Sequence, residues 1–186
     1  MHKLLIYLTI LMLSLTKVNA ASLDKTMNWE STLQEVMKEQ TFKRLGKATF
    51  SVLFWDLYKS ELLTSSGTYP MQSKNEKLIY KIQYLKAVSA KDLVEYTVEQ
   101  WQHLEIKPHK YQAFIPKISD IWPDLKVGDS LALVMSHQKS AFYFNDNLVG
   151  SIEDPMFGPL FIDIWLSEKT SEPKLRQQLL GSLIND

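Results

Sequence analysis

Residues 77–86 read KLIYKIQYLK and carry the clearest structural signal in the chain. Two sets of side chains alternate along them, with Leu78, Tyr80, Ile82 and Tyr84 on one side and Ile79, Lys81, Gln83 and Leu85 on the other. The first side is apolar or aromatic, and the second is mixed. This period of two predicts a β-strand that turns one face toward the core.

The spacing of apolar residues changes directly after this strand. Ser89 is followed three positions later by Asp92, which resembles the capping box that begins many helices. The side chains that then recur at intervals of three and four are Leu93, Val94, Thr97, Val98 and Trp101. This spacing predicts an amphipathic helix that ends near His103.

Upstream of residue 77 the sequence favours a short helix and further strands. The polar residues 31–39 predict the helix. Residues 48–57 are rich in Phe, Val and Trp and predict a strong strand with both faces largely buried, and residues 58–63 are expected to continue the sheet. Residues 64–67 read TSSG and indicate a turn.

Downstream of residue 103 helical and strand patterns alternate. Residues 111–122 predict a helix that Pro116 kinks or delays, and residues 130–136, 141–144 and 148–152 predict strands. Asp154-Pro155 and Ser171-Glu172-Pro173 begin two final helices, and Gly181 ends the last one. This order predicts an α+β fold, a large antiparallel sheet with helices packed on one face.

The first twenty residues have the pattern of a secretory signal peptide. His2 and Lys3 precede an apolar run over residues 4–15, and Val18 and Ala20 are the small residues before the expected cleavage site. A spanning helix needs about 20 apolar residues, so this run is too short for a membrane anchor. We expect cleavage after Ala20 and export of residues 21–186 to a periplasm as a single domain without a stable membrane anchor.

Composition excludes several classes of function. The chain of 186 residues has 21 basic and 21 acidic side chains, so it lacks the positive footprint of a nucleic-acid-binding protein. It contains no cysteine, which rules out disulfides and thiolate chemistry. Neither a nucleophile elbow nor a phosphate-binding glycine loop occurs, and we interpret His103, Glu105 and His109 as a solvated connector. We expect no cofactor and no metal.

The aromatic residues point instead to a ligand-binding cleft. Tyr80 and Tyr84 share a strand face, and buried tyrosines need partners for their hydroxyl groups. A sheet face of this kind, covered by helices, suits an apolar cleft with a few polar anchors. Arg44 precedes the first strong strand and is the cation that we expect to meet a ligand carboxylate.

Several motifs in the C-terminal part occur together in a known family. They read GDSL at 128–131, FYFNDNLVG at 142–150, FGPLF at 157–161 and IWLSEKTS at 164–171. With these motifs the chain resembles the bacterial branch of the chalcone isomerase-like family, over roughly residues 43–182. The resemblance implies an open-faced β-sandwich, in agreement with the α+β pattern above.

The resemblance also bears on catalysis. Plant chalcone isomerases close a flavanone ring by intramolecular addition with an Arg, a Thr, a Tyr, a Lys and an Asn. Set on this chain, the Thr position falls near Ser51, the Asn position near Thr97, and the Arg position lies upstream of Gly46, near Arg44. The Tyr and Lys positions fall near Ala90 and Leu93, which carry neither a phenol nor an amine.

Other members of this superfamily bind fatty acids without turnover. Together with the predicted signal peptide, the resemblance implies an exported, non-catalytic protein that binds a hydrophobic small molecule or fatty acid between sheet and helices. The expected ligand contacts are Arg44, Ser51, Tyr80, Tyr84 and Thr97. Two alternatives are an intramolecular lyase acting on another substrate and an envelope interaction protein without a ligand.

Overall fold

The computed structural model describes residues 30–182, in which the chain forms six strands and six helices. The strands are β1 (Lys43–Val52), β2 (Trp55–Thr64), β3 (Leu78–Tyr84), β4 (Ser130–Met135), β5 (Ser140–Phe144) and β6 (Asn147–Ile152). The helices are α1 (Leu33–Glu39), α2 (Ala90–His103), α3 (Pro108–Tyr111), α4 (Ile115–Ile121), α5 (Phe157–Leu166) and α6 (Pro173–Leu179). The predicted signal peptide lies outside the described residues.

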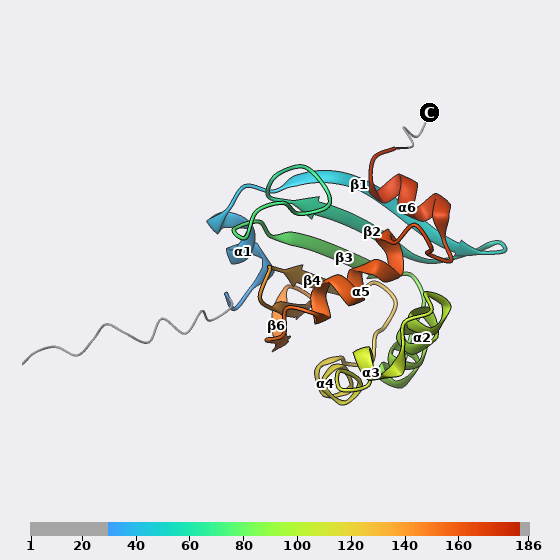
Figure 1. Cartoon of the computed structure of the whole chain (residues 1–186). Helices are drawn as coiled ribbons and strands as arrows, with labels where there is room; N and C mark the ends of the chain where they lie inside the picture. Colours follow the sequence, from blue (N-terminus) through green and yellow to red (C-terminus); the bar gives the residue numbers. More distant parts are fainter. Residues whose placement is uncertain (1–29, 183–186) are drawn as a thin grey trace, which may run out of the picture.

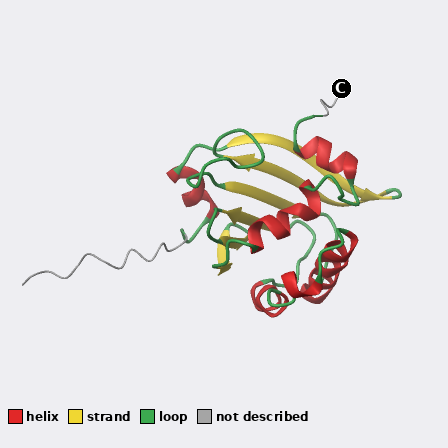
Figure 2. Cartoon of the chain, in the orientation of Figure 1, coloured by secondary structure: helices red, strands yellow, loops and turns green. Residues whose placement is uncertain are grey.

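The six strands form one antiparallel sheet in the order in which they follow along the chain (Figures 1 and 2). Figure 1 shows α5 lying across one face of this sheet, with α6 beside β1 and β2 and with α2, α3 and α4 grouped together. The α+β fold with a large antiparallel sheet is therefore confirmed. In residues 30–182 no helix is long and apolar enough to cross a bilayer.

The alternation read in residues 77–86 sets which face is buried under the helices. Leu78, Tyr80 and Ile82 belong to the main core cluster, together with inward-facing residues of β4 and β5. Phe142 of β5 packs against Phe157 and Phe161 of α5, with ring centroids 5.9 and 5.6 Å apart. Such aromatic packing supplies much of the buried area that holds helix and sheet together.

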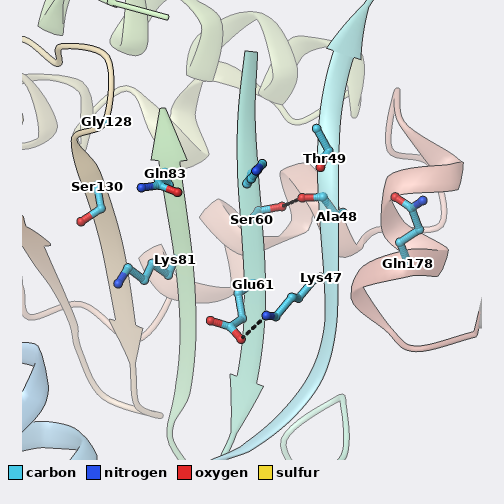
Figure 3. A pocket seen from close by; sticks show the side chains of 11 residues that line it. Lys47, Ala48, Thr49, Ser60, Glu61, Lys81, Gln83, Gly128, Ser130 and Gln178 are labelled. Carbon is cyan, nitrogen blue, oxygen red and sulfur yellow. Dashed lines mark hydrogen bonds and ion pairs between the residues drawn. The ribbon is translucent and has the colours of Figure 1, made fainter. Parts of the chain in front are cut away.

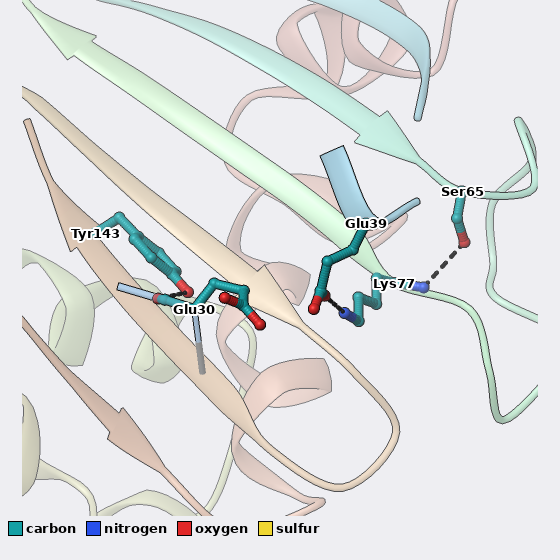
Figure 4. Close-up of polar contacts among 5 residues, drawn as sticks. All are labelled: Glu30, Glu39, Ser65, Lys77 and Tyr143. Atoms are coloured by element: carbon teal, nitrogen blue, oxygen red, sulfur yellow. Dashed lines mark hydrogen bonds and ion pairs between the residues drawn. The ribbon is translucent and has the colours of Figure 1, made fainter. Parts of the chain in front are cut away.

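The short helix α1 covers one end of the opposite face of the sheet. Its Leu33 and Val36 pack with Ile79, Val134 and Tyr143, the residues that alternate with those of the main core. Two polar contacts hold this segment in place: Tyr143 Oη donates to the Glu30 carbonyl at 3.0 Å, and Lys77 Nζ lies 3.1 Å from Glu39 Oε2 (Figure 4). The helices are thus not confined to one face, although most of them are.

The expectation of a single strand over residues 48–57 is wrong. The chain reverses at Leu53 and Phe54, so that Val52 pairs with Trp55 and the two halves form the hairpin of β1 and β2. The sequence carries none of the Asn, Asp or Gly residues that usually mark a two-residue turn, which is why the alternation continues through it.

Other boundaries follow the sequence closely. Ser89 caps α2, because its hydroxyl accepts a hydrogen bond from the Asp92 amide at 3.1 Å. Pro116 stands in the first turn of α4, where its missing amide hydrogen costs nothing, and it delays the start of that helix. The turn between β5 and β6 has positive φ at Asn145 and Asp146, 45° and 77°, the conformation that suits these residues in a hairpin.

Candidate functional site

A cavity of about 530 Å³ lies between the helices and the inner face of the sheet. The apolar part of its lining consists of Phe50, Val52, Leu57, Ile82, Ala87, Val88, Leu93, Trp122, Leu131, Leu133, Phe142, Phe161, Ile164 and Trp165. The polar part consists of Tyr58, Tyr80, Tyr84, Lys86, Tyr96, Thr97, Gln100, Ser171 and Glu172. The volume falls within the range of about 300–1,000 Å³ that is typical of small-molecule sites.

The cavity has a deep apolar end and a polar mouth. Ile82, Leu133 and Phe142 are at most 6% exposed and form part of the floor. The lining residues that are exposed, which mark the mouth, are Val52, Lys86, Ala87, Tyr96 and Ser171. This arrangement accommodates a molecule whose apolar body is buried while one polar end stays near water.

Three phenol side chains lie next to one another on the sheet wall of the cavity. The ring centroids of Tyr58 and Tyr84 are 6.2 Å apart, and the Tyr80 ring lies 4.6 Å from that of Trp165 of α5, tilted by 45°. Burial raises the pKa of Tyr58 to about 12 and raises those of Tyr80 and Tyr84 further above the ordinary value of 10.0. All three phenols are therefore neutral at physiological pH.

These tyrosines differ in their hydrogen bonds. Tyr58 Oη accepts from Trp165 Nε1 at 3.0 Å, which links the sheet to α5. Tyr80 Oη is buried without a hydrogen-bond partner among the described residues, although the nearby Tyr58 and Ser60 hydroxyls influence its pKa. The Trp122 Nε1 group is likewise buried and unpaired in residues 30–182. The cavity wall thus includes two residues with unused hydrogen-bonding capacity.

The structure brings three of the five expected contacts together. Tyr80 and Tyr84 line the sheet wall, and Thr97 lines the cavity from α2. The Thr97 hydroxyl donates to the Leu93 carbonyl at 2.8 Å, so it offers a ligand mainly its acceptor lone pairs. Leu93 itself also lines the cavity, as a purely apolar contact.

Arg44 and Ser51 do not line the cavity. Arg44 Nη1 pairs with Glu61 Oε1 at 2.9 Å on the other face of the sheet. Ser51 lies at the exposed end of the hairpin, where its hydroxyl donates to Asp56 Oδ1 at 2.6 Å. The register of β1 shifts between Arg44 and Gly46, which changes the side that Arg44 faces, whereas Ser51 alternates with Phe50 and Val52, which line the cavity, and so faces away from it.

The cation that does line the cavity is Lys86. It lies two residues beyond Tyr84 and thus continues the inward face of Tyr80, Ile82 and Tyr84, a signal that was present in the alternating pattern. Tyr58 could not have been found in this way, because its direction depends on the hairpin reversal at Leu53 and Phe54.

A second hollow, of about 480 Å³, lies mainly on the opposite face of the sheet (Figure 3). Its side chains include Lys47, Lys59, Glu61 and Lys81, and Lys47 Nζ lies 3.9 Å from Glu61 Oε1. These charged groups are solvated, as expected for the uncovered part of a sheet. Within residues 30–182 no three His, Asp or Glu side chains gather closely enough to hold a metal ion.

Comparisons with known proteins agree with this architecture. A fatty-acid binding protein of Arabidopsis thaliana, AtFAP1, has a crystal structure that matches with a TM-score of 0.59 over 76% of this chain and 88% of the plant chain, at 11% sequence identity. A Haemophilus influenzae protein described as uncharacterized is 25% identical over 137 residues, which is 74% of this chain and 67% of the relative. The family model for chalcone isomerase-like proteins matches residues 18–181. The chain therefore belongs to the chalcone isomerase-like family.

Proposed function

We propose that this protein binds an elongated apolar molecule with one polar end, such as a long-chain fatty acid, in the cavity between sheet and helices, and that it does not transform it. The observation that carries the proposal is the cavity of about 530 Å³ with an apolar floor and a polar mouth. The structural neighbour AtFAP1, a fatty-acid binding protein, supports the same ligand class.

The charged residues of the lining give the ligand a direction. Among the described lining residues, Lys86 is the cation and Glu172 the anion. Burying an ionised carboxylate deep among Ile82, Leu133 and Phe142 would be strongly unfavourable without a paired charge. A fatty acid therefore places its chain on the floor and its carboxylate at the mouth beside Lys86.

A second candidate is an intramolecular lyase, because three phenols and the Lys86 amine line one cavity. Burial favours the neutral phenols, which weakens this candidate: a general base works best with a pKa near the working pH, whereas that of Tyr58 is about 12. Ala90 and Leu93 also lack proton-transferring groups at the positions that carry them in the plant enzymes. Chalcone turnover that Tyr80→Phe abolishes without loss of binding would favour the lyase.

The test of ligand binding compares a fatty acid with the alcohol of the same chain length, titrated calorimetrically against delipidated protein. We expect saturable binding of both ligands. Lys86→Gln should weaken the fatty acid about fivefold, the effect of about 1 kcal/mol for a partly exposed ion pair, and Glu172→Gln should strengthen it. The affinity for the alcohol should not change in either variant, because it carries no charge.

A matched control is Lys91→Gln, since Lys91 is exposed on α2, pairs with Glu95 at 3.5 Å and lies outside the cavity lining. It should leave both affinities unchanged. Failure of the native protein to bind either ligand would contradict the proposal, and equal effects of Lys86→Gln on acid and alcohol would contradict the assigned direction.

We further propose that the chain is exported to the periplasm and cleaved after Ala20. The basic start, the apolar run and the small residues before the expected cleavage site support this. Intact-mass measurement of the protein from a cell-envelope fraction should give the mass of residues 21–186. A full-length mass in the cytoplasmic fraction would contradict export.

A further inference from the structure

The hairpin of β1 and β2 ends in a continuous apolar tip formed by residues 52–55, which read VLFW. Val52 is 47% exposed, Leu53 87%, Phe54 97% and Trp55 62%. Figure 1 shows this hairpin extending beyond the other strands of the sheet. Single exposed apolar residues are common on protein surfaces, but four in a row at a protruding tip indicate a contact surface.

The backbone of the turn gives an independent indication. Leu53 has a φ of 56°, in the left-handed region that glycine, asparagine and aspartate occupy easily and a bulky residue does not. A two-residue hairpin turn with Leu and Phe is therefore locally unfavourable compared with the usual Gly- and Asn-containing turns. Retaining two large apolar residues in solvent at such a position suits a function of the tip rather than folding.

The tip adjoins the mouth of the cavity. Val52 belongs both to the tip and to the exposed lining of the cavity. Lys86, also at the mouth, places its Nζ 4.6 Å from the centroid of the Trp55 ring. Tyr96, 56% exposed, lies on the mouth from α2. Apolar side chains, a tyrosine and a lysine thus surround a single opening, and the tryptophan lies beside the lysine.

We propose that this tip inserts into the interfacial region of a lipid bilayer and holds the cavity mouth against the membrane surface. Trp and Tyr favour the boundary between headgroups and acyl chains, and Lys approaches anionic headgroups there. The tip is convex and its two aromatic side chains bury about 150–250 Å² each at most. That area is well below the roughly 800 Å² per partner of a stable protein–protein interface, whereas a bilayer requires no complementary shape.

Contact of the tip with a membrane would serve the proposed ligand binding, and this role of the tip rests on the proposed function. A ligand whose carboxylate lies beside Lys86 would pass between bilayer and cavity without exposing its chain to water. The tip itself is a separate feature, so membrane contact and ligand binding can be measured independently.

The experiment is co-sedimentation of the chain 21–186 with vesicles of phosphatidylethanolamine containing a minority of phosphatidylglycerol, together with quenching of tryptophan fluorescence by brominated lipids. We expect binding and quenching for the native protein. The double variant Leu53→Gly/Phe54→Asn, which suits the turn and should fold at least as well, should reduce vesicle binding at least about tenfold. Its affinity for a fatty acid in vesicle-free solution should stay within about twofold.

The matched control is Met156→Asn, since Met156 is 59% exposed but lies outside the cavity lining. This variant should bind vesicles as the native protein does. Absence of vesicle binding by the native protein, or undiminished binding by the double variant, would overturn the proposal. A native protein that is dimeric in sedimentation equilibrium, with a double variant that is monomeric, would also overturn the proposal, because the tip would then join two copies of the chain. Vesicle binding without fatty-acid binding would leave the tip proposal standing and refute the proposed ligand.

Discussion

The hydroxyl groups of Tyr58 and Tyr80 lie on neighbouring strands of the cavity wall but contribute differently to stability. Tyr58 Oη accepts a hydrogen bond from Trp165 Nε1 at 3.0 Å, and Tyr80 Oη is buried without such a bond to a described residue. A buried donor that loses its partner costs about 1–3 kcal/mol, whereas removal of an unpaired hydroxyl costs little.

Tyr58→Phe should therefore lower the free energy of unfolding by about 1–2 kcal/mol, because it leaves the Trp165 indole unpaired. Tyr80→Phe, the matched change one strand away, should leave it unchanged within about 0.5 kcal/mol or raise it. Urea denaturation of both variants measures the difference. A larger loss for Tyr80→Phe than for Tyr58→Phe would contradict the hydrogen bonds described here.

Asp163 on α5 provides a test by pH. Burial raises the pKa of its carboxyl group above the ordinary value of 3.8, so the folded state binds the proton more tightly than the unfolded state. The carboxylate consequently destabilises the fold at neutral pH, and this penalty is lost as the pH falls through the raised pKa. Asp163→Asn should stabilise the protein at neutral pH and lose its advantage below the unfolded-state pKa. If the denaturation midpoints of the native protein and Asp163→Asn differ by the same amount at neutral pH and below the unfolded-state pKa, this assignment is contradicted.

For single residues, the sequence predicts the direction of a side chain where that direction follows from simple alternation. Tyr80 and Tyr84 were assigned to the cleft because a regular strand repeats every second residue, and the same rule extends to Lys86. Arg44 lies outside the cleft because a β-bulge shifts the register of β1 between Arg44 and Gly46, whereas Ser51 lies outside it because it alternates with Phe50 and Val52, which line the cavity. Such bulges depend on pairing between strands and leave no trace in the local pattern.

Among the elements, α6 packs unusually close to β1. A methyl group added at Gly46 would collide with the main-chain carbonyl oxygens of Gln178 and Leu179, the second at 2.6 Å. Backbone atoms cannot move aside as a flexible side chain does, so helix and strand would have to separate. Glycine is therefore required at position 46 because α6 lies so close to it. Its backbone conformation is not the reason, since its φ is not in the left-handed region.

We expect Gly46→Ala to lower the free energy of unfolding by about 1–3 kcal/mol, the usual range for overpacking in a well-packed interface. Lys47→Ala at the exposed neighbouring position is the control and should change it by less than about 0.5 kcal/mol. Thermal unfolding with calorimetric detection measures both. A Gly46→Ala variant as stable as the native protein would show that α6 is less tightly held than described.

The elements also show what local sequence can and cannot predict. The start of α2 was predictable because Ser89 and Asp92 form a local capping arrangement. The reversal at Leu53 and Phe54 was not, since neither residue favours a turn and the tertiary pairing of Val52 with Trp55 imposes it. The same departure from ordinary turn chemistry is what distinguishes the tip as a candidate functional surface.

For the whole molecule, the cavity is a property of assembly rather than of any one segment. Its lining comes from five strands, from α2 and α5, and from the connecting segments around residues 86–88, 122 and 171–172. The family resemblance and the fold were readable from spaced motifs, and both are confirmed. The volume of the cavity and the position of its mouth could not be predicted from the sequence, because they depend on how closely α2 and α5 approach the sheet.

The ligand site between sheet and helices can be tested with Ile82 and Lys81, neighbours on β3 that face opposite sides of the sheet. Ile82 is 6% exposed and lines the cavity, whereas Lys81 lies in the solvated hollow on the other face. Isothermal titration with a long-chain fatty acid should show that Ile82→Trp, which fills the cavity, reduces affinity at least about tenfold. Lys81→Trp should bind as the native protein does. Equal affinities for all three proteins would contradict a ligand site between sheet and helices.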